Sequence, residues 1–176
     1  MSIDFFLHYT VSVLLCFLLW TFCSYWIHRC AHIHSHKNPL WLVHVAHHRI
    51  PYFKVQPVRK PALGQYFFWL GDLLTSLDVI MALTLPIVVI TFIWPEYGIP
   101  LLIFHYFYEV YLSEGVLDHN GRLTGNITRY FAWGSYHLYH HADLNKNYGL
   151  MITLWDKVFG TYVFPEENFL AEKVKY

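Results

Sequence analysis

Residues 5–27 read FFLHYTVSVLLCFLLWTFCSYWI, a run with no formal charge and one histidine. At about 1.5 Å per residue, a helix of these 23 residues is long enough to cross a hydrocarbon core of roughly 30 Å. Asp4 precedes the run and Arg29 follows it, unlike the basic start and small-residue cleavage site of a signal peptide. The run therefore predicts a transmembrane helix.

Two further apolar regions follow, over residues 63–94 and 99–117, and Pro95-Glu96-Tyr97-Gly98 predicts a turn between them. Because the first region is longer than one span needs, we expect an interfacial helix near residues 63–70 before a span kinked at Pro86. The expected fold is an all-α integral membrane bundle, a single domain over residues 1–176, with about three spans at residues 5–27, 72–94 and 98–117.

The basic residues predict the orientation of the bundle. All 12 lysines and arginines lie in two blocks, residues 29–60 and 122–175. By the positive-inside rule both blocks face the cytoplasm, and three crossings satisfy that parity. We therefore expect segments 28–60 and 118–176 to form a histidine-rich helical cap on the cytoplasmic face. The membrane would be the endoplasmic reticulum in a eukaryote and the inner membrane in a bacterium.

Composition excludes several classes of protein. Charged residues make up only 14% of the 176 residues, against about 25% in soluble domains, which argues against disorder and against a solvated coiled coil. The formal net charge is zero with histidine neutral. A nucleic-acid partner is therefore not expected, because such binders carry a basic surface that neutralises phosphates.

Histidine placement carries the functional signal. Nine of the 13 histidines fall in four groups beside the two basic blocks: His28 and His32; His44, His47 and His48; His119; and His137, His140 and His141. Spacings of three and four residues predict that each H-x-x-x-H or H-x-x-H-H string projects its imidazoles in a single direction from a helix. His34 and His36 lie in a polar loop and are expected to be solvated.

Imidazole ligands suit zinc, copper, iron and nickel, and the shortage of carboxylates argues against magnesium and calcium. Nine ligands are too many for one ion, so we expect two ions with four or five ligands each. Glu109, Glu114 and Asp118 are candidates to support a metal-bound histidine by hydrogen bonding. For Glu109, a structural polar pair with His105, one helical turn away, is the alternative.

The histidine strings resemble those of the membrane-bound fatty-acid hydroxylase and sterol desaturase superfamily. The matching strings are His28-Arg-Cys-Ala-His32, His44-Val-Ala-His-His48, Leu117-Asp-His-Asn-Gly121, His137-Leu-Tyr-His-His141, Asn147-Tyr-Gly149 and Thr153-Leu-Trp-Asp-Lys-Val-Phe-Gly-Thr-Tyr162. Together they cover about residues 22 to 164. The segment Asp118-His119-Asn120-Gly121, with Glu114 before it, looks more like methyl-sterol oxidases and sterol side-chain hydroxylases than other branches.

The resemblance implies a centre of two irons held by the nine histidines, which uses O2 to hydroxylate or desaturate a lipid of sterol or fatty-acyl type. Zinc can replace iron during expression. The reaction consumes two electrons, and the sequence lacks a G-x-G-x-x-G fingerprint and a haem-domain appendage. A separate electron donor is therefore implied, either cytochrome b5 or a ferredoxin with its reductase.

The sequence departs from the family pattern at two places. Each of the histidine strings is called a box below. Many relatives carry His-Pro-x-Glu after the second box, His44–His48, where this chain has Gln56-Pro57-Val58-Arg59. Some branches have a histidine where this chain has Gly115. These differences imply a thinner ligand set for one ion and leave full activity in question. They motivate one alternative, a scaffold that keeps the boxes without turnover.

Two further functions compete with the oxygenase. A bis-histidine haem protein in electron transfer would use two to four of the histidines and leave the doublets unexplained. A metal transporter would place its ligands near mid-membrane, where Asp72, Asp78, His105 and Glu109 are the candidates.

Overall fold

A computed structural model describes residues 2–49 and 73–165 of the chain. These residues form helices, with no strand among them beyond an isolated bridge between Phe131 and Ile152. The predicted all-α class is therefore confirmed for the described residues. The expected interfacial helix near residues 63–70, together with Gln56 and Asp72, lies outside them. The helices are α1 (Ile3–Ala31), α2 (Pro39–His48), α4 (Leu73–Val79), η1 (Ile80–Thr84), α5 (Leu85–Ile93), α6 (Pro95–Phe107), η2 (Tyr108–Asp118), η3 (Gly125–Arg129), α7 (Ser135–Ala142) and α8 (Leu154–Phe159).

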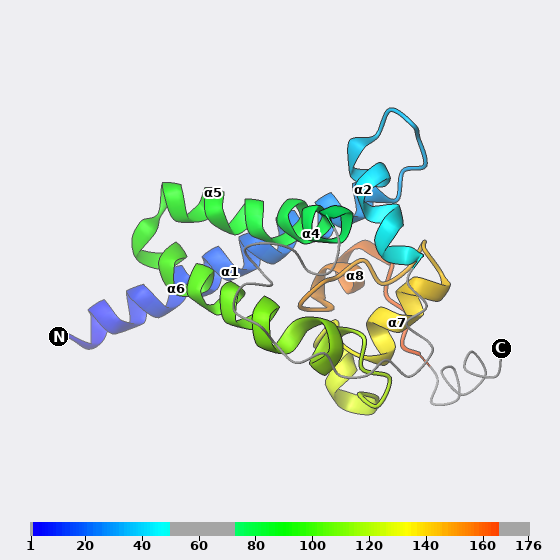
Figure 1. Ribbon diagram of the computed structural model, residues 1–176. Coiled ribbons are helices and arrows are strands. Elements are labelled where there is room, and N and C mark those ends of the chain that lie inside the picture. Colours follow the sequence, from blue (N-terminus) through cyan, green and yellow to red (C-terminus); the bar gives the residue numbers. More distant parts are fainter. Residues whose placement is uncertain (1, 50–72, 166–176) are drawn as a thin grey trace.

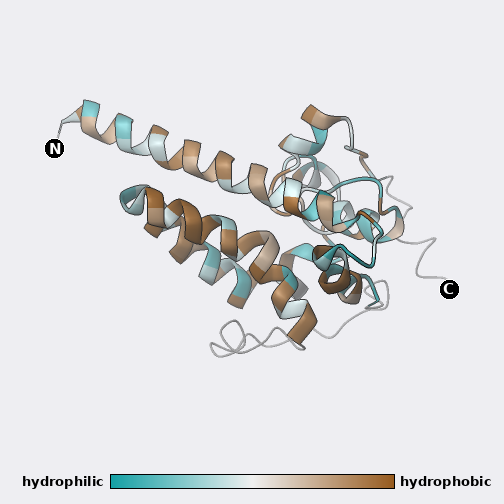
Figure 2. Cartoon of the chain, turned by 90° about the horizontal axis from the view of Figure 1, so that it is seen from above, coloured by the Kyte–Doolittle hydropathy of each residue, from teal (hydrophilic) through white to brown (hydrophobic). Residues whose placement is uncertain are grey.

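Within residues 2–49 and 73–165, two helices are long and apolar enough to cross a membrane: α1, over 29 residues, and the continuous helix Leu73–Ile93, over 21 residues. Both expose large apolar side chains, as in Leu15 on α1 and Phe92 on α5, and Figure 2 shows apolar residues around these helices. The predicted first span extends further than expected, to 3–31, and the described part of the second, 73–93, lies within its expected bounds. The third predicted span falls within α6 and η2, and the count of three spans stays a prediction.

The long helices run side by side and hold a common core. Helices α1, α5 and α6 contact one another, and their core includes Ile87, Ile90 and Leu101. Trp20 of α1 is fully buried, and its indole N–H donates to the carbonyl of Leu83 at 2.9 Å. The histidine-bearing helices α2 and α7, with α8, gather at the end of the bundle opposite the N-terminus (Figure 1).

Where the sequence predicts a kink at Pro86, the helix changes its hydrogen-bonding pattern. Residues Ile80–Thr84 form a π-helical turn, and the N–H of Leu85 donates to the carbonyl of Ile80. Proline has no N–H to donate, so the regular α-helical ladder is interrupted at this point in any case. Single π-turns occur often at functional sites, and this one lies in the helix that faces the histidines.

The segment after α7 is built around the buried carboxylate of Asp156. The carboxylate accepts four hydrogen bonds, from the N–H groups of Tyr148 (2.8 Å) and Gly149 (2.6 Å) and the hydroxyls of Thr161 (2.7 Å) and Tyr136 (2.5 Å). Burial and the adjacent carboxylate raise the pKa of Tyr136 well above its ordinary value, so its phenol stays a donor. Asp156 therefore fixes the path of residues 148–149, which lie directly against the histidines.

Replacing Asp156 with alanine would leave four donors without their acceptor. We expect Asp156→Ala to lower the free energy of unfolding by about 3 kcal/mol or more, because each buried donor without a partner costs about 1–3 kcal/mol. Thermal unfolding in detergent, followed by circular dichroism, measures this. The control is Asp4→Asn on the exposed first turn of α1, which should unfold like the original protein. Equal stability of the two variants would contradict the role given to Asp156.

Candidate metal centre

Four separate segments bring the nine predicted histidines together. His28 lies near the end of α1 and His32 is its C-cap residue, the second box lies on α2, His119 follows η2, and the last box lies on α7. They form two groups, and within each group the ligand atoms all lie within 4.8 Å of one another. The five-histidine group is His28, His32, His44, His48 and His140, and the four-histidine group is His47, His119, His137 and His141.

The prediction that each box projects its imidazoles in one direction is wrong for both H-x-x-H-H strings. On α2, His44 and His48 join the five-histidine group and His47 joins the other. On α7 the division is reversed, since His137 and His141 join the four-histidine group and His140 joins the five-histidine group. Residues four apart differ by about 40° around a helix, whereas the third position lies about 60° to the other side. Each of these two H-x-x-H-H strings therefore supplies histidines to both groups.

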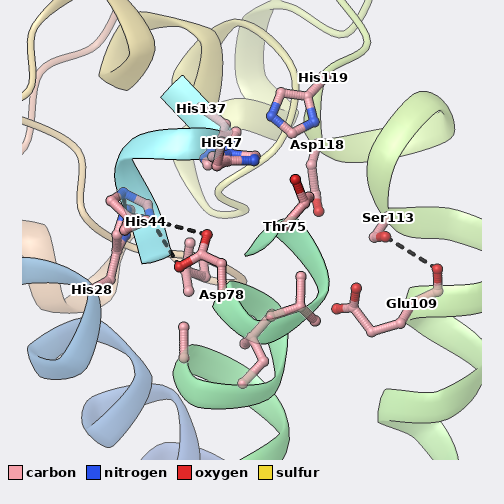
Figure 3. Close-up of a pocket in the computed structure, with 14 residues that line it drawn as sticks. His28, His44, His47, Thr75, Asp78, Glu109, Ser113, Asp118, His119 and His137 are labelled. Carbon is pink, nitrogen blue, oxygen red and sulfur yellow. Dashed lines mark hydrogen bonds and ion pairs between the residues drawn. The ribbon is translucent and has the colours of Figure 1, made fainter. Parts of the chain in front are cut away.

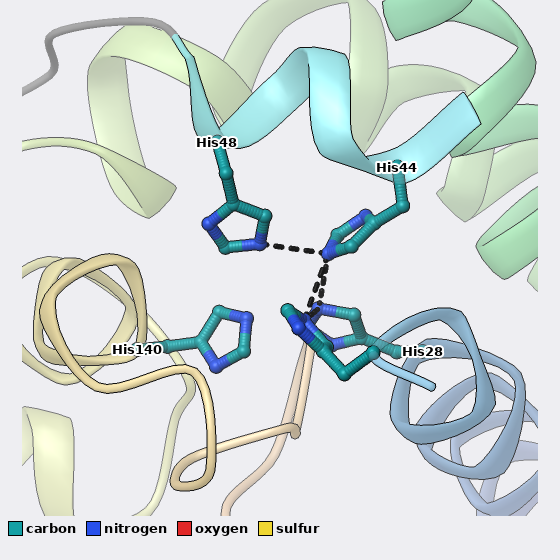
Figure 4. Close-up of side chains that lie close together, drawn as sticks. His28, His44, His48 and His140 are labelled. Carbon is teal, nitrogen blue, oxygen red and sulfur yellow. Dashed lines mark hydrogen bonds between the residues drawn. The ribbon is translucent and has the colours of Figure 1, made fainter. Parts of the chain in front are cut away.

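The imidazoles of the five-histidine group converge through their Nε2 atoms (Figure 4). His44 Nε2 lies 2.8 Å from that of His48, 2.9 Å from that of His32 and 3.1 Å from that of His28. The Nε2 atoms of His28 and His32 are 3.3 Å apart. Such distances need either a proton between each pair of nitrogens or a cation that they share.

The other ring nitrogen decides which of these applies. His28 Nδ1 lies 2.6 Å from the carbonyl of Tyr148, and His140 Nδ1 lies 2.7 Å from the carbonyl of Lys146. A carbonyl only accepts hydrogen bonds, so both Nδ1 atoms must carry the hydrogen and donate. In a neutral imidazole the Nε2 atom is then bare and presents its lone pair.

His44 is fixed in the same way by Asp78. Its Nδ1 lies 2.9 Å from each of the two carboxylate oxygens of Asp78 (Figure 3). An ionised carboxylate is an acceptor only, so Nδ1 of His44 donates, and in the neutral imidazole its Nε2 is bare. When both imidazoles are neutral, the Nε2 atoms of His28 and His44 therefore face each other at 3.1 Å with two lone pairs and no hydrogen.

Protonation of the group is opposed by its surroundings. Burial, followed by the neighbouring histidines, lowers the pKa of His32 and of His140 far below the ordinary value. The Nε2 atom of His140 is buried and has no hydrogen-bond partner among the described residues. Neutral, converging imidazole nitrogens of this kind fit a metal ion of the class that prefers nitrogen ligands.

The four-histidine group has similar geometry. His141 Nε2 lies 3.2 Å from that of His119 and 3.3 Å from that of His137. Burial lowers the pKa of His47 to about 4, and the pKa values of His137 and His141 are also well below the ordinary value. These three imidazoles are therefore neutral near pH 7 and can each offer a lone pair.

A cavity opens onto both groups from the side of the helical bundle (Figure 3). The space between its walls amounts to about 670 Å³, which includes open solvent at its mouth. Its walls combine three acids, Asp78, Glu109 and Asp118, with the hydroxyls of Thr75 and Ser113. The other described lining residues are histidines and apolar residues: His28, His44, His47, His119, His137, Val79, Ala82, Leu83 and Leu150. A substrate in this cavity would lie against the two groups.

The π-helix η2 brings Glu109 and Asp118 to the same wall of the cavity. Nine residues are about two and a half turns of an α-helix and would place the two on opposite faces, whereas the wider π-helical turn makes them about two turns. The hydroxyl of Tyr108 donates to Asp118. Glu109 Oε1 lies 3.9 Å from Nδ1 of His105, the polar pair that the sequence offered as an alternative.

The supporting roles predicted for Glu109 and Asp118 stay predictions, and the side chain of Glu114 lies outside the described part of the chain. Among the described residues, Asp78 is a carboxylate that hydrogen-bonds to one of the nine histidines, and the sequence suggested it only as a transporter ligand. No local sequence pattern pointed to this contact, because Asp78 lies 34 residues after His44 in the chain. The carbonyls of Lys146 and Tyr148 were also missed, because a backbone acceptor leaves no mark in residue type.

Curated proteins similar to the chain are oxidoreductases of lipids by name. The chain is 28% identical to a Delta(7)-sterol 5(6)-desaturase of Leptosphaeria maculans, over 87% of this chain and 37% of that protein. It is 29% identical to the alkylglycerol monooxygenase of Homo sapiens, over 88% of this chain and 30% of that protein. It is 24% identical to the lathosterol oxidase of Mus musculus, over 90% of this chain and 47% of that protein. The chain thus spans less than half the length of these relatives.

No solved structure matches the chain. A model of the fatty acid hydroxylase family matches residues 13–161, which include all nine histidines of the two groups. The match covers most of the chain and both ends of the histidine pattern. The chain therefore belongs to the fatty acid hydroxylase family.

Proposed function

We propose that the protein is a membrane-bound di-iron oxygenase that hydroxylates or desaturates a lipid of sterol or fatty-acyl type. The single observation that carries this proposal is the pair of bare Nε2 atoms on His28 and His44, 3.1 Å apart. A lone pair facing a lone pair in a buried site is unfavourable unless a cation lies between them. Seven further histidines and a family of lipid oxidoreductases by name support the same conclusion.

Two iron ions, when bound, would supply the activation of O2. The five-histidine group would hold one ion and the four-histidine group the other. Hydroxylation converts a C–H bond, O2, two electrons and two protons into C–OH and one water. Desaturation removes two hydrogens from adjacent carbons and yields a C=C bond and two waters from the same inputs. The chain's own residues contribute neutral nitrogen ligands, their orientation, and a cavity that restricts access of water.

Lipid access and electron supply follow from the surroundings of the site. The cavity lies between helices whose outer faces are apolar, so we infer that a lipid enters it from the membrane. Both histidine groups gather at the end of the bundle where the basic blocks lie, which favours a site on the cytoplasmic face. Electrons would come from cytochrome b5 or from a ferredoxin with its reductase.

The competing functions are less compatible with the geometry. Nitrogens 2.8–3.3 Å apart leave no room for a porphyrin plane between them, which argues against a bis-histidine haem. Of the transporter candidates, Asp72 lies outside the described residues and Asp78 is hydrogen-bonded to His44. Asp78 thus serves the histidine groups in the proposed enzyme. A scaffold without turnover differs from the enzyme only in its products, and the second experiment below separates them.

Metal content distinguishes the two groups. We expect about two ions per chain in protein purified in mild detergent, and about one ion in each of two double variants. His32→Ala with His48→Ala removes two ligands of the five-histidine group, and His137→Ala with His141→Ala removes two of the other. Inductively coupled plasma mass spectrometry measures the stoichiometry.

The matched control is His34→Ala with His36→Ala, which removes two exposed histidines of the loop before α2. It should retain about two ions. Equal metal content in all four proteins, or none in the original one, would exclude the histidine groups as the site.

Turnover is tested with isotopically labelled oxygen. Cells that express the protein are supplied with sterols, fatty acids and alkylglycerols under ¹⁸O2, and lipid products are analysed by mass spectrometry. Incorporation of ¹⁸O into a new hydroxyl indicates hydroxylation, whereas loss of two hydrogens without label in the product indicates desaturation. Both signals should fall to background in the His32→Ala, His48→Ala variant. Metal binding without any product would support the scaffold.

A further inference from the structure

We propose that Asp78 is a positioning residue that fixes the tautomer of His44 and thereby sets the metal affinity of the five-histidine group. The inference rests on the proposed function of this group as a metal centre. Neither the histidine strings nor the family match assigns a role to Asp78, which lies 34 residues after His44 in the chain and on a different helix.

His44 occupies the central position in its group. Its Nε2 atom is within 3.1 Å of the Nε2 atoms of three other members, His28, His32 and His48. A rotation of this one ring therefore changes the spacing of most of the donor set. The side chain is only 3% exposed, so its orientation is set by contacts within the protein and not by water.

Asp78 determines which nitrogen of His44 carries the hydrogen. A free neutral imidazole can place its hydrogen on either nitrogen, and the form with hydrogen on Nε2 has no lone pair to offer a metal. Both carboxylate oxygens of Asp78 lie 2.9 Å from Nδ1, which selects the Nδ1–H form. Carboxylates that hydrogen-bond to metal-ligating histidines also raise ligand basicity, and their loss typically costs about 10- to 100-fold in affinity.

Asp78 differs from the other two acceptors described for this group. His28 and His140 donate to backbone carbonyls, which are neutral and are held by the fold. Asp78 instead accepts through its side-chain carboxylate, which is negatively charged. This side chain is 14% exposed at the cavity wall. It therefore places a negative charge next to a group that would hold a cation with neutral ligands alone.

The test uses a background that contains only this group, made with His137→Ala and His141→Ala. In that background we measure Zn²⁺ affinity by competition with a chelator for the original Asp78, Asp78→Ala and Asp78→Asn. We expect alanine to weaken binding about 10- to 100-fold. Asparagine keeps an oxygen that accepts from Nδ1 but loses the charge, so it should keep the tautomer and restore part of the affinity. Asp4→Ala, which removes an exposed carboxylate on the first turn of α1, is the control and should bind like the background.

A second readout separates positioning from a structural role. ¹⁵N spectra of histidine-labelled apoprotein, with His44 identified by its absence in His44→Gln, should show the Nδ1–H form in the original and Asp78→Asn proteins. In Asp78→Ala this preference should be lost. Unchanged affinity or an unchanged tautomer in Asp78→Ala overturns the proposal for Asp78 while the metal centre stands. Absence of Zn²⁺ binding in the background itself overturns the metal centre. If Asp78→Ala fails to fold, the test rests on Asp78→Asn. A 100-fold loss of Zn²⁺ affinity in this variant, together with loss of the Nδ1–H form of His44, overturns the claim that an acceptor oxygen at position 78 positions His44.

Discussion

The arrangement of the histidine-bearing helices depends on nitrogen lone pairs that face one another. His28 and His44 each donate a hydrogen bond from Nδ1 to an acceptor that cannot donate in return, and their bare Nε2 atoms are 3.1 Å apart. In the absence of a cation this contact is repulsive, and burial opposes protonation of the surrounding imidazoles. In the proposed enzyme, metal binding would supply the interaction that holds the ends of α1, α2 and α7 together. Asp156 supports it from outside by fixing the segment that carries the carbonyl of Tyr148.

Much of this arrangement follows from local sequence patterns. The uncharged run before His28 predicts a long helix, and α1 covers it from Ile3 to Ala31. The H-x-x-H-H strings predict helices at α2 and α7, because histidines at positions i and i+4 share a face, and both helices form there. Residue type alone also predicts metal chemistry, since nine imidazoles with few carboxylates suit a narrow set of ions.

The remainder depends on contacts that no local pattern encodes. The division of each box between two groups requires knowing that α2 and α7 approach each other, and Asp78 contacts His44 across 34 residues of chain. The carbonyls of Lys146 and Tyr148 act through the backbone and have no signature in residue type. The π-helical form of η2 was also not predicted. An α-helical period would place Glu109 and Asp118 on opposite faces of the helix, whereas both line the cavity.

The most direct measurement of the central claim is anomalous X-ray scattering at the iron edge from crystals of protein loaded with Fe²⁺ without oxygen. The account predicts two peaks, one among the Nε2 atoms of the five-histidine group and one within the four-histidine group. A single peak, or peaks away from these nitrogens, would contradict it.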